Sequence, residues 1–261
     1  MRQEFEVRVI SLENQLERRA RMNHLLDGVF SWKFFDAIAG KDISLETSFY
    51  DQARRLKIFG YDLRINEIAC FLSHRALWEE SIRLNKNILI MEDDISFSFQ
   101  DDGEYTIKTL NYLGGKLNDS LFVRLGNSQV RKDNILIASI DANYSLCRFY
   151  RDPLGAFAYL VSPKVAKQLI ENSKKIFTPV DDYMWRGWGH GCLLLDVTPN
   201  FIFTQEDGNP STIGNREKPK ISLLSKASRE WFRFFDNKEK MQYELQAVNR
   251  FKKHNKYNEN Y

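Results

Sequence analysis

The hydrophobic pattern at the start of the chain predicts a strand, a helix and a second strand. Residues 6–12 have the alternation and the β-branched side chains that are typical of a strand. Asn14 followed by Glu17 matches the spacing at which helices begin, and a helix is expected over residues 17–26. Residues 32–36 then have the pattern of a second strand. Such a βαβ unit implies two parallel strands joined by a right-handed crossover.

A second helix and strand follow this unit. Apolar residues recur at helical spacing between residues 66 and 84, with Asn66 as a candidate N-cap. The short apolar run 88–91 predicts a buried strand, and it ends directly in the acidic run Glu92-Asp-Asp94. This unit therefore places three carboxylates at the carboxyl end of a strand, where open α/β sheets bind their ligands.

The rest of the chain continues the mixed pattern. Ser162-Pro163 and Thr178-Pro179 are both typical helix starts. Further strands are expected at 121–125, 156–161, 193–197 and 200–204, the last two as a pair around Pro199, and 134–148 is interpreted as a hairpin. The predicted fold class is α/β, with a mixed, mainly parallel sheet flanked by helices over residues 1–215 and a helical extension over residues 216–261.

Composition and charge are those of an ordinary globular protein with a basic tail. Hydrophobic residues make up 43% of the 261 residues and charged residues 28%. The formal net charge is +3, and residues 216–261 hold 12 Lys or Arg against 6 Asp or Glu, which leaves residues 1–215 slightly negative. The chain shows no signal peptide, no membrane-spanning run and no paired cysteine motif. A cytoplasmic location is expected.

The three adjacent carboxylates after the buried strand need an explanation, because they repel one another. A hard divalent cation with oxygen ligands is the usual one. Since side chains alternate along a strand, Glu92 and Asp94 are expected on one side, where they can share an ion, and Asp93 on the other, where it orients or caps. The alternative is a solvated acidic turn, since acids are common at strand ends.

Other common catalytic motifs are absent from the sequence. Residues 187–191 contain a Gly-x-Gly unit, but it precedes a strand and does not open a helix after one, which argues against a dinucleotide-binding loop. There is no Walker A loop and no Gly-x-Ser-x-Gly nucleophile elbow. The four histidines form no His-Glu-x-x-His pair, which argues against a zinc hydrolase. A metal-dependent reaction organised on carboxylates is the class that is left.

Five segments follow one another along the chain in an order shared with a known family. They are Val9-Ile-Ser-Leu12 with Glu17-Arg-Arg19, Glu67-Ile-Ala-Cys-Phe-Leu-Ser-His74 with Trp78, Ile90-Met-Glu-Asp-Asp94, Gly155-Ala-Phe-Ala-Tyr-Leu-Val-Ser162, and Pro179-Val-Asp181. Together they resemble glycosyltransferase family 25, which includes bacterial lipopolysaccharide glycosyltransferases and procollagen galactosyltransferases. The chain departs from the family's pattern at Asn66 and Ala158, where glycine is usual, and these changes concern substrate details. The Ser-His block and the Asp-Asp motif favour the bacterial branch.

The resemblance implies a GT-A type fold, a UDP-sugar donor, Mn²⁺ or Mg²⁺ as cofactor, and inversion at the anomeric carbon. Glu92 and Asp94 are then expected to hold the ion. His190 is a candidate third ligand, and its alternative is a solvated side chain in a glycine-rich loop. Inversion also needs a carboxylate base on the far face of the sugar. Asp181 is the expected base and Asp182 the second choice, with helix capping as the alternative role of Asp181.

The remaining expected site residues bind the nucleotide-sugar. Arg18 and Arg19 are expected near the donor phosphates, because guanidinium groups bind phosphate bidentately, although one of the two is expected to face only solvent. Two roles are open for Ser73 and His74. Either they contact the nucleotide-sugar, or they are buried residues of the helix, with the histidine bonded to a carbonyl. The full set expected to bind the donor is Leu12, Asn14, Arg18, Arg19, Ser73, His74, Asp93 and Gly155.

The aromatic residues outside this set have two interpretations each. Tyr159, Trp185 and Trp188 are expected in the core, with sugar stacking as the alternative. The C-terminal extension interleaves basic and aromatic residues at 231–235 and 250–253. This pattern suits either peripheral contact with an anionic membrane or a helix that packs on the catalytic domain and exposes a basic face. No motif for nucleic-acid binding is present.

The sequence therefore predicts an inverting, metal-dependent glycosyltransferase that moves galactose from UDP-galactose to a lipooligosaccharide or lipopolysaccharide acceptor. The same chemistry with UDP-glucose or another UDP-sugar is the nearest alternative. A carbohydrate-binding relative without turnover is the alternative from another class, and the acidic triplet together with Asp181 argues against it. The sequence does not define the linkage or the oligomeric state.

Overall fold

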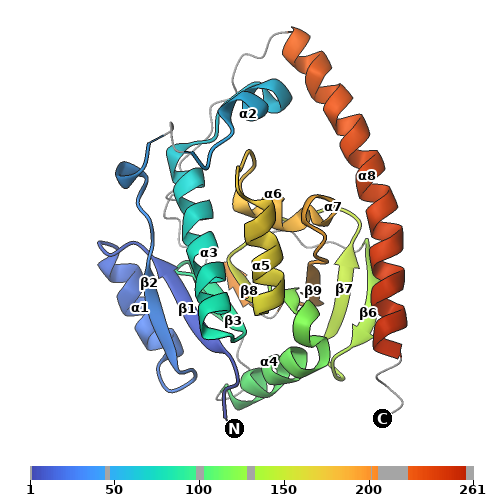
Figure 1. The fold of residues 1–261 in the computed structure, drawn as a ribbon. Coiled ribbons are helices and arrows are strands. Elements are labelled where there is room, and N and C mark those ends of the chain that lie inside the picture. The colour runs from blue at the N-terminus through green and yellow to red at the C-terminus, as the bar shows by residue number, and fades with distance from the viewer. Residues whose placement is uncertain are drawn as a thin grey trace.

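The computed structural model describes residues 2–44, 48–97, 103–127, 133–200, 202–204 and 223–256. These residues form an eight-stranded sheet with helices on both faces, a small two-stranded sheet and a long C-terminal helix (Figure 1). In spatial order the strands of the large sheet are β2 (Trp32–Asp36), β1 (Glu6–Ser11), β3 (Ile88–Glu92), β8 (Ala158–Val161), β5 (Phe122–Arg124), β9 (Leu195–Thr198), β7 (Ser145–Phe149) and β6 (Asn134–Ser139).

The large sheet is mixed, and most of its strands run in one direction. β1 pairs in parallel with β2 and β3, and β5 pairs in parallel with β9. β8 is antiparallel to β3 and β5, and β7 is antiparallel to β9 and β6. Within this sheet only β8 and β7 therefore oppose the common direction. The α/β architecture predicted from the sequence is confirmed, and it is consistent with a GT-A type fold.

Helices cover both faces of the sheet. The helices α1 (Leu16–Leu26) and α4 (Glu104–Leu117) contribute buried side chains to one core, and the helices α3 (Ile65–Leu84), α5 (Pro163–Asn172) and α6 (Val180–Trp185) contribute to the other. In Figure 1 the second group lies in front of the sheet. The remaining elements are η1 (Gly40–Asp42), α2 (Gln52–Phe59), β4 (Ile95–Phe97), η2 (Asn118–Ser120), α7 (Gly187–His190), β10 (Ile202–Thr204) and α8 (Leu223–Lys256).

The strand β3 shows how the sequence pattern builds these two cores. Leu89 and Met91 belong to the core under α1 and α4, whereas Ile88 and Ile90 belong to the core under α3 and α5. Because both faces are covered, all four side chains are fully buried and the strand is a continuous apolar run. This packing places the last residue of β3, Glu92, at the carboxyl end of the strand.

Two predicted helix starts are wrong by one or two residues. The helix α1 begins after Gln15, and the side chain of Asn14 is exposed and does not cap it. The helix α3 begins after Arg64, whose N–H donates to the carboxylate of Glu67 at 2.8 Å, so Asn66 lies inside the first turn. Both sequences offer several polar residues in a row, and spacing alone does not select among them.

The two proline-marked helix starts differ in outcome. Ser162 caps α5 as predicted, since its hydroxyl accepts from the N–H of Val165 at 3.4 Å. The helix α6 begins after Pro179 and has no side-chain cap, so the prediction of Thr178 as its cap is wrong.

One predicted strand pairing is also wrong. β9 lies inside the large sheet between β5 and β7, whereas β10 pairs antiparallel with β4 in the small sheet. Strand propensity in both segments was visible in the sequence, but the partner of each is set by long-range packing. The interpretation of 134–148 as a hairpin is confirmed by the antiparallel pairing of β6 and β7.

The helix α8 packs along one side of the domain, from α2 to the hairpin of β6 and β7 (Figure 1). Glu244 pairs with the buried Arg148 of β7, and Asp236 pairs with Arg186, which follows α6. These contacts confirm the interpretation of the extension as a packed helix. The predicted boundary at residue 215 lies outside the described residues.

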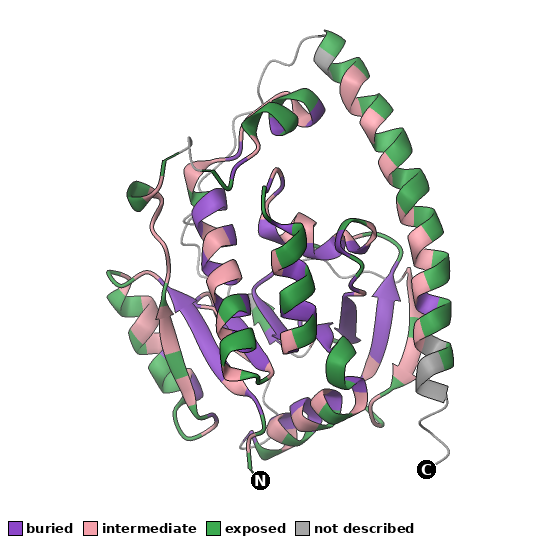
Figure 2. Ribbon diagram, in the orientation of Figure 1, coloured by how far each residue is buried: buried purple, intermediate pink, exposed green. Residues whose placement is uncertain are grey.

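The outer face of α8 is not purely basic. Figure 2 shows that most of this helix is exposed, and its exposed side chains include Leu224, Trp231, Phe234, Met241 and Leu245. In the part of the chain that the structure describes, no helix has a stretch long and apolar enough to cross a membrane.

Candidate functional site

A cavity of about 310 Å³ lies at the carboxyl ends of β1, β2 and β3. Two chain segments and one helix face surround the acidic triplet there. The lining residues are Ile10, Ser11, Leu12, Gln15 and Arg18 from β1 and α1, residues 37–40 after β2, Asn66, Ala69, Cys70 and Ser73 from α3, and Glu92, Asp93 and Asp94 after β3. The location is the one that α/β topology predicts for a ligand site.

Asp93 is held in place by two side chains from the first βα unit. One carboxylate oxygen accepts from the Ser11 hydroxyl at 2.6 Å, and the other accepts from Nη1 of Arg18 at 2.9 Å. Arg21 in addition donates to the backbone carbonyl of Asp93 and to that of Ile95. With both oxygens hydrogen-bonded and the side chain buried, Asp93 orients the turn between β3 and β4.

Asp94 is in the opposite situation. Its Oδ1 is buried and has no hydrogen-bond partner among the described residues. Burial, together with the charges of Glu92 and Asp93, raises the pKa of Asp94 to about 6, against the opposing effect of Arg18. A buried carboxylate oxygen without a donor is costly unless something positive binds it.

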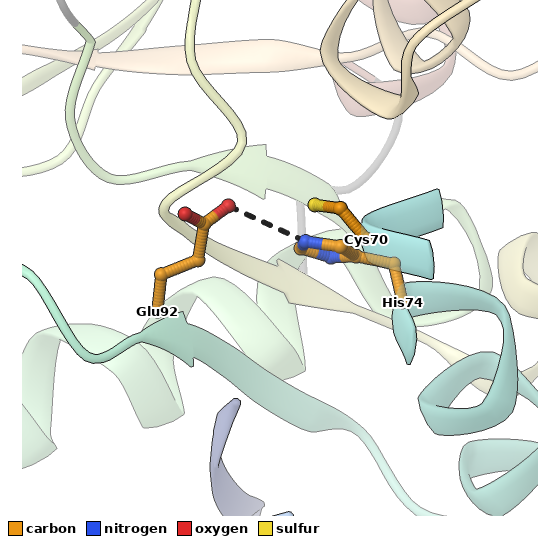
Figure 3. Close-up of side chains that lie close together, drawn as sticks. All are labelled: Cys70, His74 and Glu92. Atoms are coloured by element: carbon orange, nitrogen blue, oxygen red, sulfur yellow. Dashed lines mark ion pairs between the residues drawn. The ribbon is translucent and has the colours of Figure 1, made fainter. Parts of the chain in front are cut away.

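Glu92 faces α3, where His74 and Cys70 lie one helical turn apart (Figure 3). Its Oε1 is 3.4 Å from Nε2 of His74, and the ligand atoms of the three residues lie within 4.8 Å of one another. His74 is fully buried and its Nδ1 lies 2.9 Å from the hydroxyl of Tyr159. Burial, and then the charge of Glu92, raise the pKa of the Cys70 thiol well above its usual value.

The prediction that Glu92 and Asp94 share one side of a strand needs correction. The strand β3 ends at Glu92, and Asp93 and Asp94 form the turn into β4. Strand alternation therefore stops at Glu92, and the turn brings all three acids to the cavity. Asp93 has the orienting role that was expected of the third acid.

Ser73 lies on the cavity wall, but its hydroxyl serves the fold. It accepts from the N–H of Ile38 at 2.9 Å and donates to the carbonyl of Ala69 at 2.9 Å. This link holds the 37–40 segment against α3. At the end of that segment, a Cβ on Gly40 would lie 2.1 Å from the side-chain oxygen of Asn66, so a larger residue there would displace that side chain.

The two arginines of α1 have different roles. Arg18 lines the cavity and pairs with Asp93. Arg19 binds the carbonyls of Ser11 and Leu12 and the carboxylate of Asp36, and its guanidinium lies 4.7 Å from the centre of the Phe34 ring. Arg19 therefore ties α1 to β1 and β2. Neither arginine faces only solvent, which corrects one expectation.

Of the other residues expected at the donor site, some line the cavity and some do not. Leu12 lines the cavity, and its carbonyl accepts from Gln15 and Arg19. Asn14 is exposed and does not line the cavity. Gly155 lies in a separate turn, with φ at 96°, and its carbonyl accepts from Arg124 at 2.9 Å.

Asp181 and Asp182 lie in the first turn of α6. Burial raises the pKa of Asp181, and the charges of Asp152 and Glu92 add to that rise, against the hydrogen bond that Asp181 accepts from the N–H of Asp182. Burial also raises the pKa of Asp182 to about 6, against the attraction of Arg186. The charge of Glu92 is thus one of the causes of the raised pKa of Asp181, although Asp181 is not among the residues that line the cavity.

His190 is not available to an ion in this arrangement. Its Nε2 lies 3.1 Å from the carbonyl of Tyr183 and 3.3 Å from that of Met184, and its Nδ1 accepts from the N–H of Cys192 at 3.2 Å. It is buried in α7, and burial lowers its pKa to about 4. The expectation of a solvated loop is wrong, and the role as third metal ligand loses its geometric basis, because both ring nitrogens are occupied.

A buried charge cluster next to β8 was missed at the sequence level. Arg124 is fully buried and pairs with Asp196 at 2.7 Å and with Asp152 at 3.2 Å. These residues come from three distant segments, and no local pattern marks them as partners. Arg124 also donates to the carbonyl of Gly155. The charge of Asp152 raises the pKa of Asp181, and the charge of Arg124 lowers it.

The residues around Asp94 fit a divalent cation. Three carboxylates line the cavity, and Arg18 is the one cation among its described lining residues. Arg18 is already paired with Asp93, so Asp94 keeps a buried oxygen without a donor. Carboxylate oxygens with surplus negative charge are the ligands that Mg²⁺ and Mn²⁺ prefer.

Comparisons with known proteins agree with the sequence motifs. The family described as glycosyltransferase family 25 (LPS biosynthesis protein) matches residues 5–184. A glycosyltransferase 25 family member of Anopheles gambiae is 28% identical over 211 residues, which cover 75% of this chain and 32% of that protein. An inactive glycosyltransferase 25 family member 3 of Mus musculus is 33% identical over 194 residues, which cover 69% of this chain and 31% of that protein.

The chain thus spans about a third of the length of these curated relatives. The family match extends from β1 to α6, and it includes the cavity, the acidic triplet and Asp181. On this match over more than half of its length, the chain belongs to glycosyltransferase family 25.

Proposed function

We propose that this chain is an inverting, metal-dependent glycosyltransferase that moves a hexose from a UDP-sugar to a saccharide acceptor. The observation that carries the proposal is Asp94, whose buried oxygen has no donor among the described residues, in a cavity lined by three carboxylates at the carboxyl ends of the parallel strands. A carboxylate in that position is a poor structural element and a good cation ligand.

The cation belongs beside Asp94, with Glu92 as the nearest further carboxylate. Bound there, Mn²⁺ or Mg²⁺ would neutralise the charge that develops on the leaving diphosphate. Arg18 is the residue of this chain placed to bind a donor phosphate, because it lines the same cavity and its guanidinium already faces an anion. Asp93 holds Arg18 in that position.

Asp181 is the proposed base. An inverting transfer requires a carboxylate that takes the proton of the acceptor hydroxyl. The raised pKa of Asp181 makes it a stronger base than an exposed aspartate. Asp181 lies within the family match, and the charge of Glu92 contributes to the rise of its pKa.

Galactose from UDP-galactose and a lipooligosaccharide or lipopolysaccharide acceptor are the specific substrates we propose. The acceptor is supported by the wording of the family description and by the resemblance to the bacterial branch. An acceptor lipid would place the protein at a membrane surface, and the exposed Trp231, Phe234 and Leu245 of α8 would suit peripheral contact there. Co-sedimentation with anionic vesicles, compared with Trp231→Ser, measures that contact.

A binding protein without turnover is the second candidate, because several relatives are named inactive or probable inactive family members. Such a protein would have no need for an unpaired carboxylate next to a cavity. The presence of Asp94 and Asp181 favours turnover in this chain.

The test is UDP release from UDP-galactose, UDP-glucose and other UDP-sugars, with and without Mn²⁺, for the wild type, Asp94→Ala and Asp181→Asn. We expect Mn²⁺-dependent release that both variants lose. Release without metal, or undiminished release by both variants, would contradict the mechanism. Donor binding without release on any matched acceptor would favour the binding protein.

A further inference from the structure

A line of buried polar side chains connects the core of α3 to Glu92. Nε1 of Trp78 lies 2.8 Å from the hydroxyl of Tyr159, which lies 2.9 Å from Nδ1 of His74. All three residues are fully buried. The remaining nitrogen of His74, Nε2, lies 3.4 Å from Oε1 of Glu92 and forms no hydrogen bond among the described residues (Figure 3).

Counting donors and acceptors fixes the direction of this line. An indole N–H can only donate, so Trp78 donates to the oxygen of Tyr159. Tyr159 has one hydrogen to donate, and among the described residues the acceptor within reach is Nδ1 of His74. If Nδ1 carried a hydrogen, that of Tyr159 would have no acceptor in a site closed to water. His74 therefore accepts at Nδ1 and, when neutral, carries its hydrogen on Nε2.

This tautomer places an N–H dipole opposite the carboxylate of Glu92. At 3.4 Å the contact is longer than a well-formed hydrogen bond, so it acts as an electrostatic attraction on a half-buried side chain. We propose that Tyr159 fixes His74 as the Nε2–H tautomer, and that His74 is a positioning residue that orients the carboxylate of Glu92 as the second cation ligand, beside Asp94 as the principal one. The functional part of this inference rests on the proposed function.

The same donor count argues against a different metal site. Cys70, His74 and Glu92 present sulfur, nitrogen and oxygen atoms within 4.8 Å of one another, a set that Zn²⁺ accepts (Figure 3). A zinc ion on His74 would need a bare Nε2. The hydrogen would then move to Nδ1, and the buried hydroxyl of Tyr159 would lose its acceptor. We therefore expect this triangle to remain metal-free.

The tautomer is measured by ¹⁵N NMR of the imidazole nitrogens in the metal-free protein, with His74 assigned by its absence in His74→Gln. We expect a pyrrole-type shift at Nε2 and a pyridine-type shift at Nδ1. The reverse pattern overturns the inference, as does stoichiometric binding of Zn²⁺ that shifts the His74 signals and is lost in Cys70→Ser. This measurement needs no substrate, so it stands even if no UDP-sugar is turned over.

The positioning role is measured by Mn²⁺ titration of His74→Leu and His74→Gln. We expect Mn²⁺ affinity to fall roughly 10- to 100-fold in His74→Leu, the usual effect of losing a partner that orients a ligand, and to recover in large part in His74→Gln, whose amide N–H can replace Nε2–H. Equal affinity in the wild type and His74→Leu overturns the positioning role. Equal losses in both variants, with unchanged thermal stability, also overturn it.

Discussion

Carboxylates on helix α8 are paired with cationic side chains, whereas one carboxylate oxygen in the acidic cavity has no partner among the described residues. On α8, Glu244 pairs with the buried Arg148, and Asp236 binds both Arg186 and the indole N–H of Trp188. In the cavity, Asp94 has a buried oxygen with no donor among the described residues. The paired carboxylates hold the structure together, whereas the unpaired one is available to the cation that we propose.

Asp93 shows that this difference is local and not a property of acidic runs. It is adjacent to Asp94 in sequence, yet both its oxygens are bound, by Ser11 and Arg18. One residue of the pair therefore stabilises the turn and the other is left for a ligand. The comparison predicts which carboxylate substitutions reduce catalysis and which reduce stability.

The largest effect is expected from Asp94→Asn. The amide keeps the size of the side chain and removes its charge, so a cation loses its principal ligand. We expect turnover to fall by at least about 10³-fold, in the range found when the group that stabilises a leaving charge is lost. UDP release under saturating Mn²⁺ measures it, and a cooperative thermal unfolding transition shows that the fold is intact. Turnover within a few-fold of wild type would contradict a special role of Asp94.

A loss of similar size is expected from Asp181→Asn. Removal of a general base costs roughly 10²- to 10⁴-fold in kcat, while Mn²⁺ affinity should stay unchanged because the residue does not hold the ion. Comparing kcat with Mn²⁺ affinity in one preparation separates the two roles. Asp182→Asn is the matched neighbour, and a larger kcat loss there would move the base to Asp182.

Glu244→Gln, on helix α8, should reduce stability and leave catalysis unchanged. The substitution leaves the buried guanidinium of Arg148 without its carboxylate, next to the Trp185 ring. We expect the free energy of unfolding to fall by about 3 kcal/mol, the usual cost of removing one partner of a buried ion pair. Urea unfolding measures it. A loss of turnover per folded molecule as large as that of Asp94→Asn would erase the distinction between the regions.

The smallest predicted effect is a pH dependence set by Asp94. Its pKa in the folded protein is about 6, above the ordinary 3.8, so the folded state holds this proton more tightly than the unfolded state. The metal-free protein should therefore lose stability as the pH rises from about 4 to about 6. Binding of Mn²⁺ must displace the same proton, so its affinity should fall up to about tenfold per pH unit below about 6. Asp94→Asn should remove both trends, and their persistence in that variant would assign them to another group.

Much of the fold could be predicted because its signals are local. The strand β3 is a continuous apolar run, and the hairpin of β6 and β7 and the start of α5 at Ser162 follow from neighbouring residues. Pairings between distant segments were less accessible. The partner of β10 is β4, more than a hundred residues away, and no local pattern in either segment specifies it.

The same distinction between local and long-range signals applies to the site. The acidic triplet and its place at the end of a strand were predictable, because they depend on one segment. The different roles of Asp93 and Asp94 were not predictable, because they depend on Ser11 and Arg18, which bind Asp93 only. His190 failed as a predicted ligand for a similar reason, because the carbonyls that occupy its Nε2 come from the end of α6.

The most direct test of the central claim is a Mn²⁺ titration followed by the EPR signal of the free ion, for the wild type and Asp94→Asn, with Asp182→Asn as control. The account predicts one bound Mn²⁺ in the wild type and in Asp182→Asn, with higher affinity when UDP is present, and a loss of that binding in Asp94→Asn. Equal Mn²⁺ affinity in the wild type and Asp94→Asn, or no Mn²⁺ binding by the wild type with UDP present, would contradict it.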